Sequence, residues 1–436
     1  MNRVSTINYS SEELNKLREQ LLNYLAPHCT SILLDSNTAK AGQIPVTGFR
    51  YDLLGGSGVL DGVCSDTHNL TDLEEFIDRH RAGQHYIFGY FSYDLKNEFE
   101  NLSSSHPDHL LFPAWRFFVP ETLFIAQSGS FQIITENVDA GEVMKKIESS
   151  KAFESTGRTG RLTNYPDKNS YTENIRKILH HIQRGDIYEM NYCEEIRIEN
   201  CDLHPASVYQ NLTQLSPNPF SAYYTHGSHA IACASPERFM TRRGNKITSQ
   251  PMKGTMPRSD DPVLDEQNKT QLRDSKKERS ENVMITDLVR NDLSRISTRG
   301  SVKVDELFGV YAFKRSWQMI TTVSCEVEEG IKFNDIIKAL FPMGSMTGAP
   351  KISAMQLIEK YESFRRGIFS GSIGYIAPNG DFDFNVVIRS IAFNRTLKRA
   401  SIAAGGAITC SSDPEKEFEE MMLKLRPQLE GLGIEL

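Results

Sequence analysis

A predicted β-hairpin in the last third of the chain constrains the fold more than any other feature of the sequence. In the stretch GSIGYIAPNGDFDFNVVIRSIAF, residues 371–393, the pair Asn379-Gly380 separates two apolar runs. An Asn-Gly pair in this setting is typical of a tight turn between antiparallel strands, because glycine adopts the positive φ angles that such turns need. The sequence therefore predicts antiparallel strand pairing.

The rest of the chain contains many strand-like segments with helices interspersed, without a regular strand-helix-strand alternation. This pattern favours an α+β fold over a doubly wound parallel sheet. A weaker, charged segment at 141–169 is expected to connect an N-terminal region, 1–140, to a larger region, 170–436. The two regions are expected to form one compact unit.

Composition excludes several classes of protein. The chain has 436 residues, 39% of them hydrophobic, and a net charge of −7 without a basic stripe. It should bury a sizeable core, and neither nucleic acid nor an anionic membrane is an expected partner. The seven cysteines form no CxxC pair, and no apolar run reaches the roughly 18 residues of a membrane span. The expected location is the cytoplasm.

A helix and a strand are predicted directly after the connector. The helix has Ser170 and Glu173 at the spacing of a capping box and ends at Gly185. The following strand alternates, which places Glu189, Asn191 and Cys193 on one face. These side chains are expected to line a cleft.

An acidic helix is predicted near the C-terminus, with Asp413 as its N-cap and Pro414 in its first turn. Glu417, Glu420 and Lys424 fall at i, i+3 and i+7 and therefore share one side. From the pattern alone this side is a solvated acidic face with a Glu420–Lys424 ion pair.

A second acidic helix, within residues 275–295, places Glu281 beside the apolar Ile285. A carboxylate on an apolar face must be paired, protonated or bound to a cation, because burying it alone costs several kcal/mol. If the two acidic helices face each other, Glu281 and Glu420 are candidate ligands for Mg²⁺, which usually takes one or two protein carboxylates.

Seven short motifs occur in order along the second region, and together they resemble those of the chorismate-binding enzymes. They are ASPERF (234–239), PMKGTMPR (251–258), ENVMITDLVRNDLSR (281–295), GSMTGAPK (344–351), GSIGY (371–375), IRS (388–390) and AGGAI (404–408). The resemblance covers residues 160–430 and, less specifically, the N-terminal region. It implies a sandwich of two large, mostly antiparallel sheets with helices outside and the active site in a cleft between the sheets.

Lys253 in PMKGT indicates the subgroup. Anthranilate, isochorismate and salicylate enzymes typically carry alanine at this position, and aminodeoxychorismate synthase component I carries lysine, so the sequence resembles the latter. The resemblance implies that Lys253 adds to C2 of chorismate as the C4 hydroxyl leaves, and that ammonia then enters at C4. The amine must be neutral to attack, and burial next to a divalent cation is expected to lower its pKa.

The other site residues follow from the same resemblance. Glu237 would be the general acid for the leaving hydroxyl, which requires a raised pKa; the alternative is an ion pair with Arg238. Mg²⁺ on Glu281 and Glu420, with Glu417 acting through water, would hold the ring carboxylate. The remaining carboxylate-binding candidates are Thr347, with free backbone N–H groups at a helix start, and Tyr375, Arg389, Gly405, Gly406, Ala407 and Lys424.

Two positions depart from the family pattern. Glu189 in YEMN stands where a glutamine is familiar, and Gln318 in SWQMITTV stands where many members have histidine. Both are predicted to lie near the substrate. These departures leave room for altered substrate handling or an inactive paralogue.

The source of ammonia and a regulatory pocket are further expectations. The chain shows no GxCxG-type cysteine turn of a glutamine amidotransferase, so ammonia is expected from a separate glutaminase subunit. LLDSN at 33–37 resembles the LLES stretch by which relatives bind tryptophan, which makes Asp35 and Ser36 candidates for such a pocket. The alternative is a buried strand that ends in an Asp-Ser-Asn turn.

Three functions remain open from the sequence. The first is synthesis of 4-amino-4-deoxychorismate for 4-aminobenzoate and folate, with chorismate and ammonia as substrates. The second is anthranilate synthesis. The third is non-catalytic binding of chorismate or tryptophan by a paralogue that no longer turns over.

Overall fold

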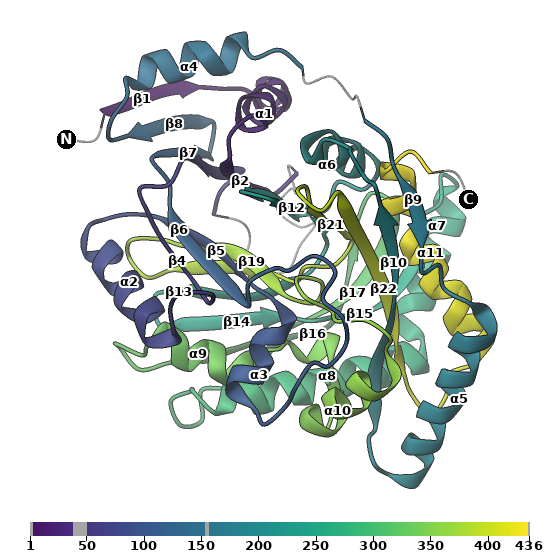
Figure 1. Cartoon of the computed structure of the whole chain (residues 1–436). Helices are drawn as coiled ribbons and strands as arrows, with labels where there is room; N and C mark the ends of the chain where they lie inside the picture. Colours follow the sequence, from purple (N-terminus) through teal and green to yellow (C-terminus); the bar gives the residue numbers. More distant parts are fainter. Residues whose placement is uncertain (1–2, 38–49, 153–156, 435–436) are drawn as a thin grey trace.

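Two large sheets face each other in the computed structural model, which describes residues 3–37, 50–152 and 157–434 (Figure 1). Over these residues neighbouring strands run antiparallel. The first sheet has the order β1 (Arg3–Asn8), β8 (Ser130–Thr135), β7 (Thr122–Gln127), β3 (Leu53–Ser57), β2 (Thr30–Asp35), β11 (Phe220–His226), β12 (His229–Ser235), β21 (Ser390–Asn394), β22 (Arg399–Ile408), β10 (Glu189–Glu199), β18 (Gly348–Ala349), with β9 (Arg161–Thr163) on β10. The second has the order β15 (Met252–Pro257), β17 (Ser316–Glu326), β14 (Lys246–Gln250), β13 (Arg238–Arg243), β20 (Phe382–Asn385), β19 (Ser372–Ile376), β5 (Ile87–Phe91), β6 (Trp115–Val119), β4 (Asp61–Cys64), with β16 (Lys303–Ala312) on β17.

Helices cover the outer faces of both sheets (Figure 1). On the first sheet lie α1 (Ser11–Leu25), α4 (Ala140–Ser149), α5 (Lys168–Arg184), α6 (Pro205–Leu215), α10 (Lys351–Tyr361) and α11 (Pro414–Gly431). On the second lie α2 (Leu70–Ala82), α8 (Lys276–Ser294) and α9 (Phe333–Leu340); α3 (Lys96–Phe99) and α7 (Pro262–Asp274) are the remaining α-helices described. Within the described ranges no helix is both long and apolar enough to cross a membrane.

The core follows from the alternation of side chains along the strands. On β11, Tyr224 is buried between the sheets, and Tyr223 is buried under the helices of the first sheet. On β5, Phe88 likewise points between the sheets, whereas Phe91 packs under the helices of the second sheet. Both faces of each sheet are therefore apolar over much of their area, and the predicted sandwich is confirmed.

The predicted hairpin is present at residues 372–385. β19 pairs with β20, and Ile376 lies opposite Phe382. Gly380 adopts a φ of 84°, and its N–H donates to the carbonyl of Ala377 at 2.9 Å. Gly380 thus provides the left-handed residue that closes the turn.

The helix and strand predicted after the connector are also present. α5 ends at Gly185, whose φ is 82°, and β10 begins at Glu189. The predicted capping box is wrong, because the N-cap is Asp167, whose side chain accepts from the N–H of Ser170. Glu173 instead pairs with Lys177, 2.7 Å away and one turn further along the helix.

Both sheets combine strands from the two sides of the predicted connector. β2 pairs with β11 in the first sheet, and β5 pairs with β19 in the second. The segment 141–169 contains most of α4, and its strand β9 pairs with β10. Strands from the N-terminal region are therefore integral to the sheets that carry the candidate site.

Candidate active site

A β-bulge in β15 orients Lys253. Met252 lies opposite Ile320 and Thr255 lies opposite Gln318, so β15 has one residue more than β17 between these pairs. Gly254 has a φ of 99°, a backbone conformation that residues other than glycine rarely adopt. A bulge of this kind re-aims the neighbouring side chain, which explains why glycine follows the lysine.

Lys253 forms a buried ion pair across the two sheets. Its Nζ lies 2.6 Å from Oε1 of Glu189 on β10, and the side chains are 9% and 1% exposed. The second carboxylate oxygen, Oε2 of Glu189, has no hydrogen-bond partner among the described residues. Lys253 is therefore not the solvated surface charge that an isolated lysine would most often be.

In the protein without a bound cation the pKa of Lys253 lies above its ordinary value, whereas a lowered pKa is expected beside a divalent cation. Burial acts to lower the pKa, but the charges of Glu189, Glu281 and Glu237 oppose it and leave the pKa above its ordinary value. The expected lowering depends on a neighbouring cation, whereas these three carboxylates act in the opposite direction. Before the amine can attack, its proton must be transferred to another group.

Glu237, in the turn between β12 and β13, is 5% exposed. Burial raises the pKa of its carboxyl group to about 7, against the opposing effects of Ser345 and Lys253. The alternative ion pair with Arg238 is wrong, because Nε of Arg238 donates to Asp383 at 2.9 Å. Glu237 therefore has the raised pKa that a general acid needs at neutral pH.

The cavity next to Glu237 is small in this structure. It has a volume of about 20 Å³, and Gly344 and Ser345 are among its lining residues. This volume suffices for one water molecule. Lys253, Glu189 and Glu281 do not line it.

The two acidic helices face each other around Lys277. Glu281 on α8 is 7% exposed, and Glu417 on α11 is 4% exposed. Nζ of Lys277 lies 3.9 Å from Oε1 of Glu281 and 3.6 Å from Oε1 of Glu417. Burial raises the pKa of both carboxyl groups, that of Glu281 to about 7. The face predicted as solvated is thus partly buried, although the expected Glu420–Lys424 pair is present at 2.7 Å.

The residues around Lys277 fit a divalent cation in part. Among the described residues, no three His, Cys, Asp or Glu side chains converge closely enough to hold a metal ion, and Glu420 pairs with Lys424. Glu281 and Glu417 do face one positive charge, and Oε1 of Glu281 has no hydrogen-bond partner within the described part of the chain. Two carboxylates suit Mg²⁺, whose remaining ligands are commonly water and substrate.

The glycine run on β22 lies beside these carboxylates. Nζ of Lys424 donates to the carbonyl of Gly405 at 2.9 Å. A β-carbon at Gly406 would lie 3.2 Å from Oε2 of Glu417 and 3.7 Å from Nζ of Lys424. Ala407 follows in the strand, opposite Asn191 of β10.

Arg389 lies close to Lys424 and bonds to the backbone of α11. Its Nη1 donates to the carbonyl of Lys424 at 2.9 Å, and among the described residues no carboxylate lies within ion-pair distance of its guanidinium. Burial lowers the pKa of Arg389 to about 10, so the group stays charged at neutral pH. A buried guanidinium without an acidic partner is suited to bind a substrate carboxylate.

Thr347 lies beside Asn191 of β10, whose N–H donates to the carbonyl of Thr347 at 2.7 Å. The N–H of Thr347 donates to the carbonyl of Gly344 at 3.1 Å, and its hydroxyl donates to the carbonyl of Met343 at 3.2 Å. The predicted free N–H at this residue is therefore already used. Gly348 packs so closely that a β-carbon there would overlap the carbonyl oxygen of Glu189.

Gln318 lies beside the strand that carries Lys253. Its Oε1 accepts from the hydroxyl of Thr255 at 2.7 Å, and its Nε2 donates to the hydroxyl of Ser316 at 2.7 Å. These bonds hold the residue in the sheet next to the bulge. Within the described residues, Gln318 forms no hydrogen bond with Lys253.

Tyr375 is placed apart from this site, which corrects its assignment to the enolpyruvyl carboxylate. Because β19 alternates, its ring points between the sheets and lines a cavity of about 60 Å³ that Asp35 and Ser36 also line. Asp35 is bonded there to Nε of Arg18 at 2.5 Å and accepts from the N–H of Asn37. The Asp-Ser-Asn turn is present, and the cavity beside it stays a candidate ligand pocket.

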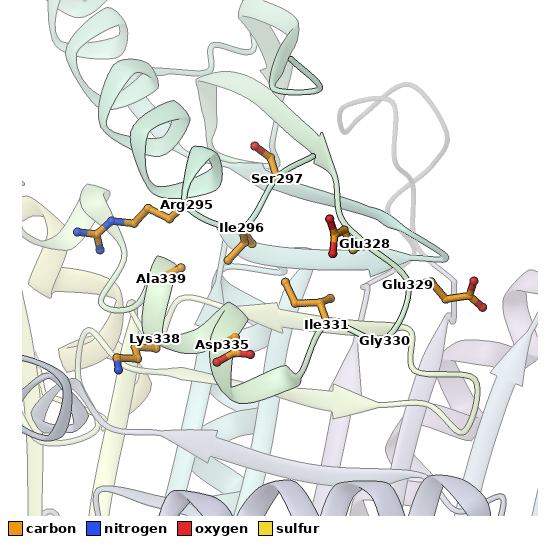
Figure 2. Close-up of a pocket in the computed structure, with 10 residues that line it drawn as sticks. All are labelled: Arg295, Ile296, Ser297, Glu328, Glu329, Gly330, Ile331, Asp335, Lys338 and Ala339. Atoms are coloured by element: carbon orange, nitrogen blue, oxygen red, sulfur yellow. The ribbon is translucent and has the colours of Figure 1, made fainter. Parts of the chain in front are cut away.

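A larger hollow lies elsewhere (Figure 2). It has a volume of about 670 Å³ and is formed by the loop at 328–331 with the ends of α8 and α9. Its charged side chains, such as Arg295 and Glu329, point in different directions in Figure 2. This hollow contains none of the residues predicted for the active site.

Sequence reasoning missed Lys277 and the buried pair of Glu362 and Arg366. Lys277 lies at i−4 from Glu281, a spacing at which opposite charges pair on a helix, so the pattern could have indicated it. Arg366 and Glu362 also lie four residues apart. The sequence does not show that this second pair is buried against the candidate site.

Two comparisons identify the family. The sequence profile described as chorismate binding enzyme matches residues 36–430. Aminodeoxychorismate synthase component 1 of Escherichia coli (strain K12) is 32% identical over 348 residues, which cover 79% of this chain and 76% of that protein. The chain therefore belongs to the chorismate binding enzyme family.

Other relatives agree with this assignment over different lengths. The chloroplastic aminodeoxychorismate synthase of Arabidopsis thaliana is 38% identical over 271 residues, 60% of this chain, and the match spans only 29% of that protein. The solved structure of MenF, the menaquinone-specific isochorismate synthase from Escherichia coli, has the same fold, with a TM-score of 0.77 at 19% identity, covering 99% of this chain and 94% of that chain.

Proposed function

We propose that this chain converts chorismate and ammonia to 4-amino-4-deoxychorismate through a covalent adduct on Lys253. The observation that carries the proposal is a buried lysine beside Glu189 and Glu237, at the point where the two sheets meet. The similarity to aminodeoxychorismate synthase component 1 supports the same reaction. The product would serve 4-aminobenzoate and folate synthesis in the cytoplasm.

The first chemical step would form the adduct. Lys253 transfers its proton to Glu189, 2.6 Å away, and the neutral amine adds to C2 of chorismate. The ring double bonds shift, the C4–O bond breaks, and Glu237 gives its proton to the leaving hydroxyl, which departs as water. The nitrogen of Lys253 is then a secondary ammonium, and the enolpyruvyl ether is intact.

The second step would release the product. Ammonia adds at C4, the double bonds shift back, and the C2–N bond breaks with its electrons returning to the lysine nitrogen. The amine of Lys253 recovers its proton from Glu189. Glu237 regains a proton from solvent, which restores the starting state.

Substrate binding would use the charged groups around this amine. Arg389, Lys424 and the N–H groups at Gly405, Gly406 and Ala407 suit the enolpyruvyl carboxylate. Glu281 and Glu417 would hold Mg²⁺, with Glu420 as a further ligand, and the ion would bind the ring carboxylate. Ammonia would come from a separate glutaminase subunit.

Product identification tests the proposed function. The chain is incubated with chorismate, ammonium and Mg²⁺, and the products are identified by mass spectrometry. The proposal predicts a 4-amino product that retains the enolpyruvyl group. Anthranilate with pyruvate would instead support an anthranilate synthase, and chorismate binding without consumption would support a non-catalytic paralogue.

The metal requirement is tested at Glu281. Glu281→Gln removes one carboxylate charge from α8, so the affinity for Mg²⁺ should fall at least about tenfold. Calorimetric titration with Mg²⁺ measures this directly, without any assay of activity. Asp287→Asn, on the exposed side of the same helix, is the matched control and should bind Mg²⁺ like the wild type. Equal affinities of Glu281→Gln and wild type would remove Glu281 from the metal site.

A further inference from the structure

Glu362 and Arg366, directly after α10, form the most deeply buried ion pair of the described residues. Each side chain is 1% exposed, and Nη2 and Nε of Arg366 donate to the two oxygens of Glu362 at 2.6 and 2.9 Å. The pair has no part in the proposed chemistry. The pair lies next to β10 and the turn at 344–346, two segments close to the candidate active site.

Arg366 uses all its N–H groups within the protein. Besides its bonds to Glu362, Nη1 donates to the carbonyl of Met346 at 2.7 Å and to the hydroxyl of Ser370 at 3.4 Å. Nη2 also donates to the carbonyl of Asn191 at 3.0 Å. A guanidinium has five N–H donors, and five acceptors surround this one.

Glu362 extends the network to a third backbone site. Its Oε1 accepts from the N–H of Cys193 at 2.9 Å. Cys193 lies opposite Gly405 of β22. The ion pair thus bonds to β10 at two positions, both within four residues of Glu189.

The segments that this network joins carry candidate substrate residues. Met346 immediately precedes Thr347, whose carbonyl accepts from the N–H of Asn191 at 2.7 Å. Asn191 follows Glu189 by two residues, and Glu189 bonds to the amine of Lys253. A shift of β10 against the turn at 344–346 would therefore move the partner of Lys253.

Stability alone is a weak reason for such a pair. Burying both charges costs several kcal/mol, and apolar residues of similar volume at such positions are often as stabilising or more so. We propose that the Arg366–Glu362 pair positions the candidate active site by fixing β10 and the turn at 344–346 relative to each other. The inference rests on the proposed function for its catalytic readout.

Two variants separate positioning from stability. Arg366→Lys keeps the charge but has only three donors, too few for the carboxylate and both carbonyls. The double variant Glu362→Met with Arg366→Met removes both charges without leaving one unpaired. Arg365→Lys is the matched control, because Arg365 is partly exposed and pairs with Asp94 at 2.8 Å.

The first readout is the rate per folded molecule in the 4-amino product assay. The double variant should unfold within a few degrees of the wild type, and its kcat should be about 100-fold lower, since small displacements of reacting groups cost this much. Arg366→Lys should lose a similar factor, and Arg365→Lys should lose none. A double variant that folds normally and keeps kcat within threefold of wild type overturns the inference.

The second readout does not depend on the reaction. Hydrogen exchange measured by mass spectrometry should be at least about tenfold faster in 187–194 and 343–349 of the double variant, and unchanged in β7 and β8. If wild type forms no 4-amino product but this local change is seen, the proposed function fails and the positioning role stands. Unchanged exchange in both segments overturns the positioning role.

Discussion

Removing the amine of Lys253 is expected to abolish amination of chorismate. Truncating Lys253 alone would leave Glu189 as an unpaired buried charge, which costs about 3–5 kcal/mol and could unfold the site. We therefore compare Glu189→Gln with the double variant Glu189→Gln and Lys253→Met. The two proteins differ only in the amine, and loss of a covalent nucleophile should lower the rate at least about 1,000-fold.

The measurement is the rate of 4-amino product formation at saturating ammonium and Mg²⁺. Lys246→Ala is the matched control, because Lys246 lies on β14, which β17 separates from β15, and pairs with Asp305 at the surface. It should keep the wild-type rate. With a measurable rate in Glu189→Gln, an equal rate in the double variant would show that Lys253 is not the nucleophile.

Glu237→Gln is expected to have the second largest effect. A positioned general acid contributes about 100- to 10,000-fold, so kcat should fall by a factor in this range. The pH profile gives a sharper result. The acid acts in its protonated form and its pKa is about 7, so the wild-type rate should be level below pH 7 and fall about tenfold per pH unit above it.

In Glu237→Gln that decline should disappear, because glutamine does not titrate. Glu326→Gln, at the exposed end of β17, should keep both the wild-type rate and its decline above pH 7. A Glu237→Gln variant that keeps the full rate would show that another group donates the proton. A decline that persists in this variant would assign the titration to a different residue.

Glu189, which stands where a glutamine is familiar in the family, contributes to the raised pKa of Lys253. A carboxylate here pairs with the ammonium, whereas a glutamine would add no charge. The empty protein therefore holds the amine in its protonated form. Deprotonation then becomes part of the reaction rather than a property of the resting site.

Local sequence signals predicted the elements well where a turn or cap residue determines the structure. Gly380 and Gly185 both adopt the left-handed conformation that the sequence indicated, and Asp413 caps α11. The capping box at Ser170 was wrong because Asp167 offers the same chemistry three residues earlier. Helix starts with several candidate caps are ambiguous from sequence alone.

Local sequence patterns could not predict the contacts between strands that are far apart in the sequence. The charges of Glu237 and Glu281 act on Lys253, and the direction of the Tyr375 side chain depends on the alternation of β19 within the second sheet. The Glu189–Lys253 bond joins residues 64 positions apart on different sheets. Its effect on the pKa of the amine could not be predicted before both strands were placed.

Peptide mass spectrometry of the chain with chorismate and Mg²⁺, in the absence of ammonia, tests whether Lys253 is the covalent nucleophile. We expect the peptide containing Lys253 to gain the mass of chorismate less one water, and added ammonium to remove this adduct and yield the 4-amino product. Formation of that product with Lys253 unmodified at every time point, or an adduct on another residue, would contradict this role of Lys253.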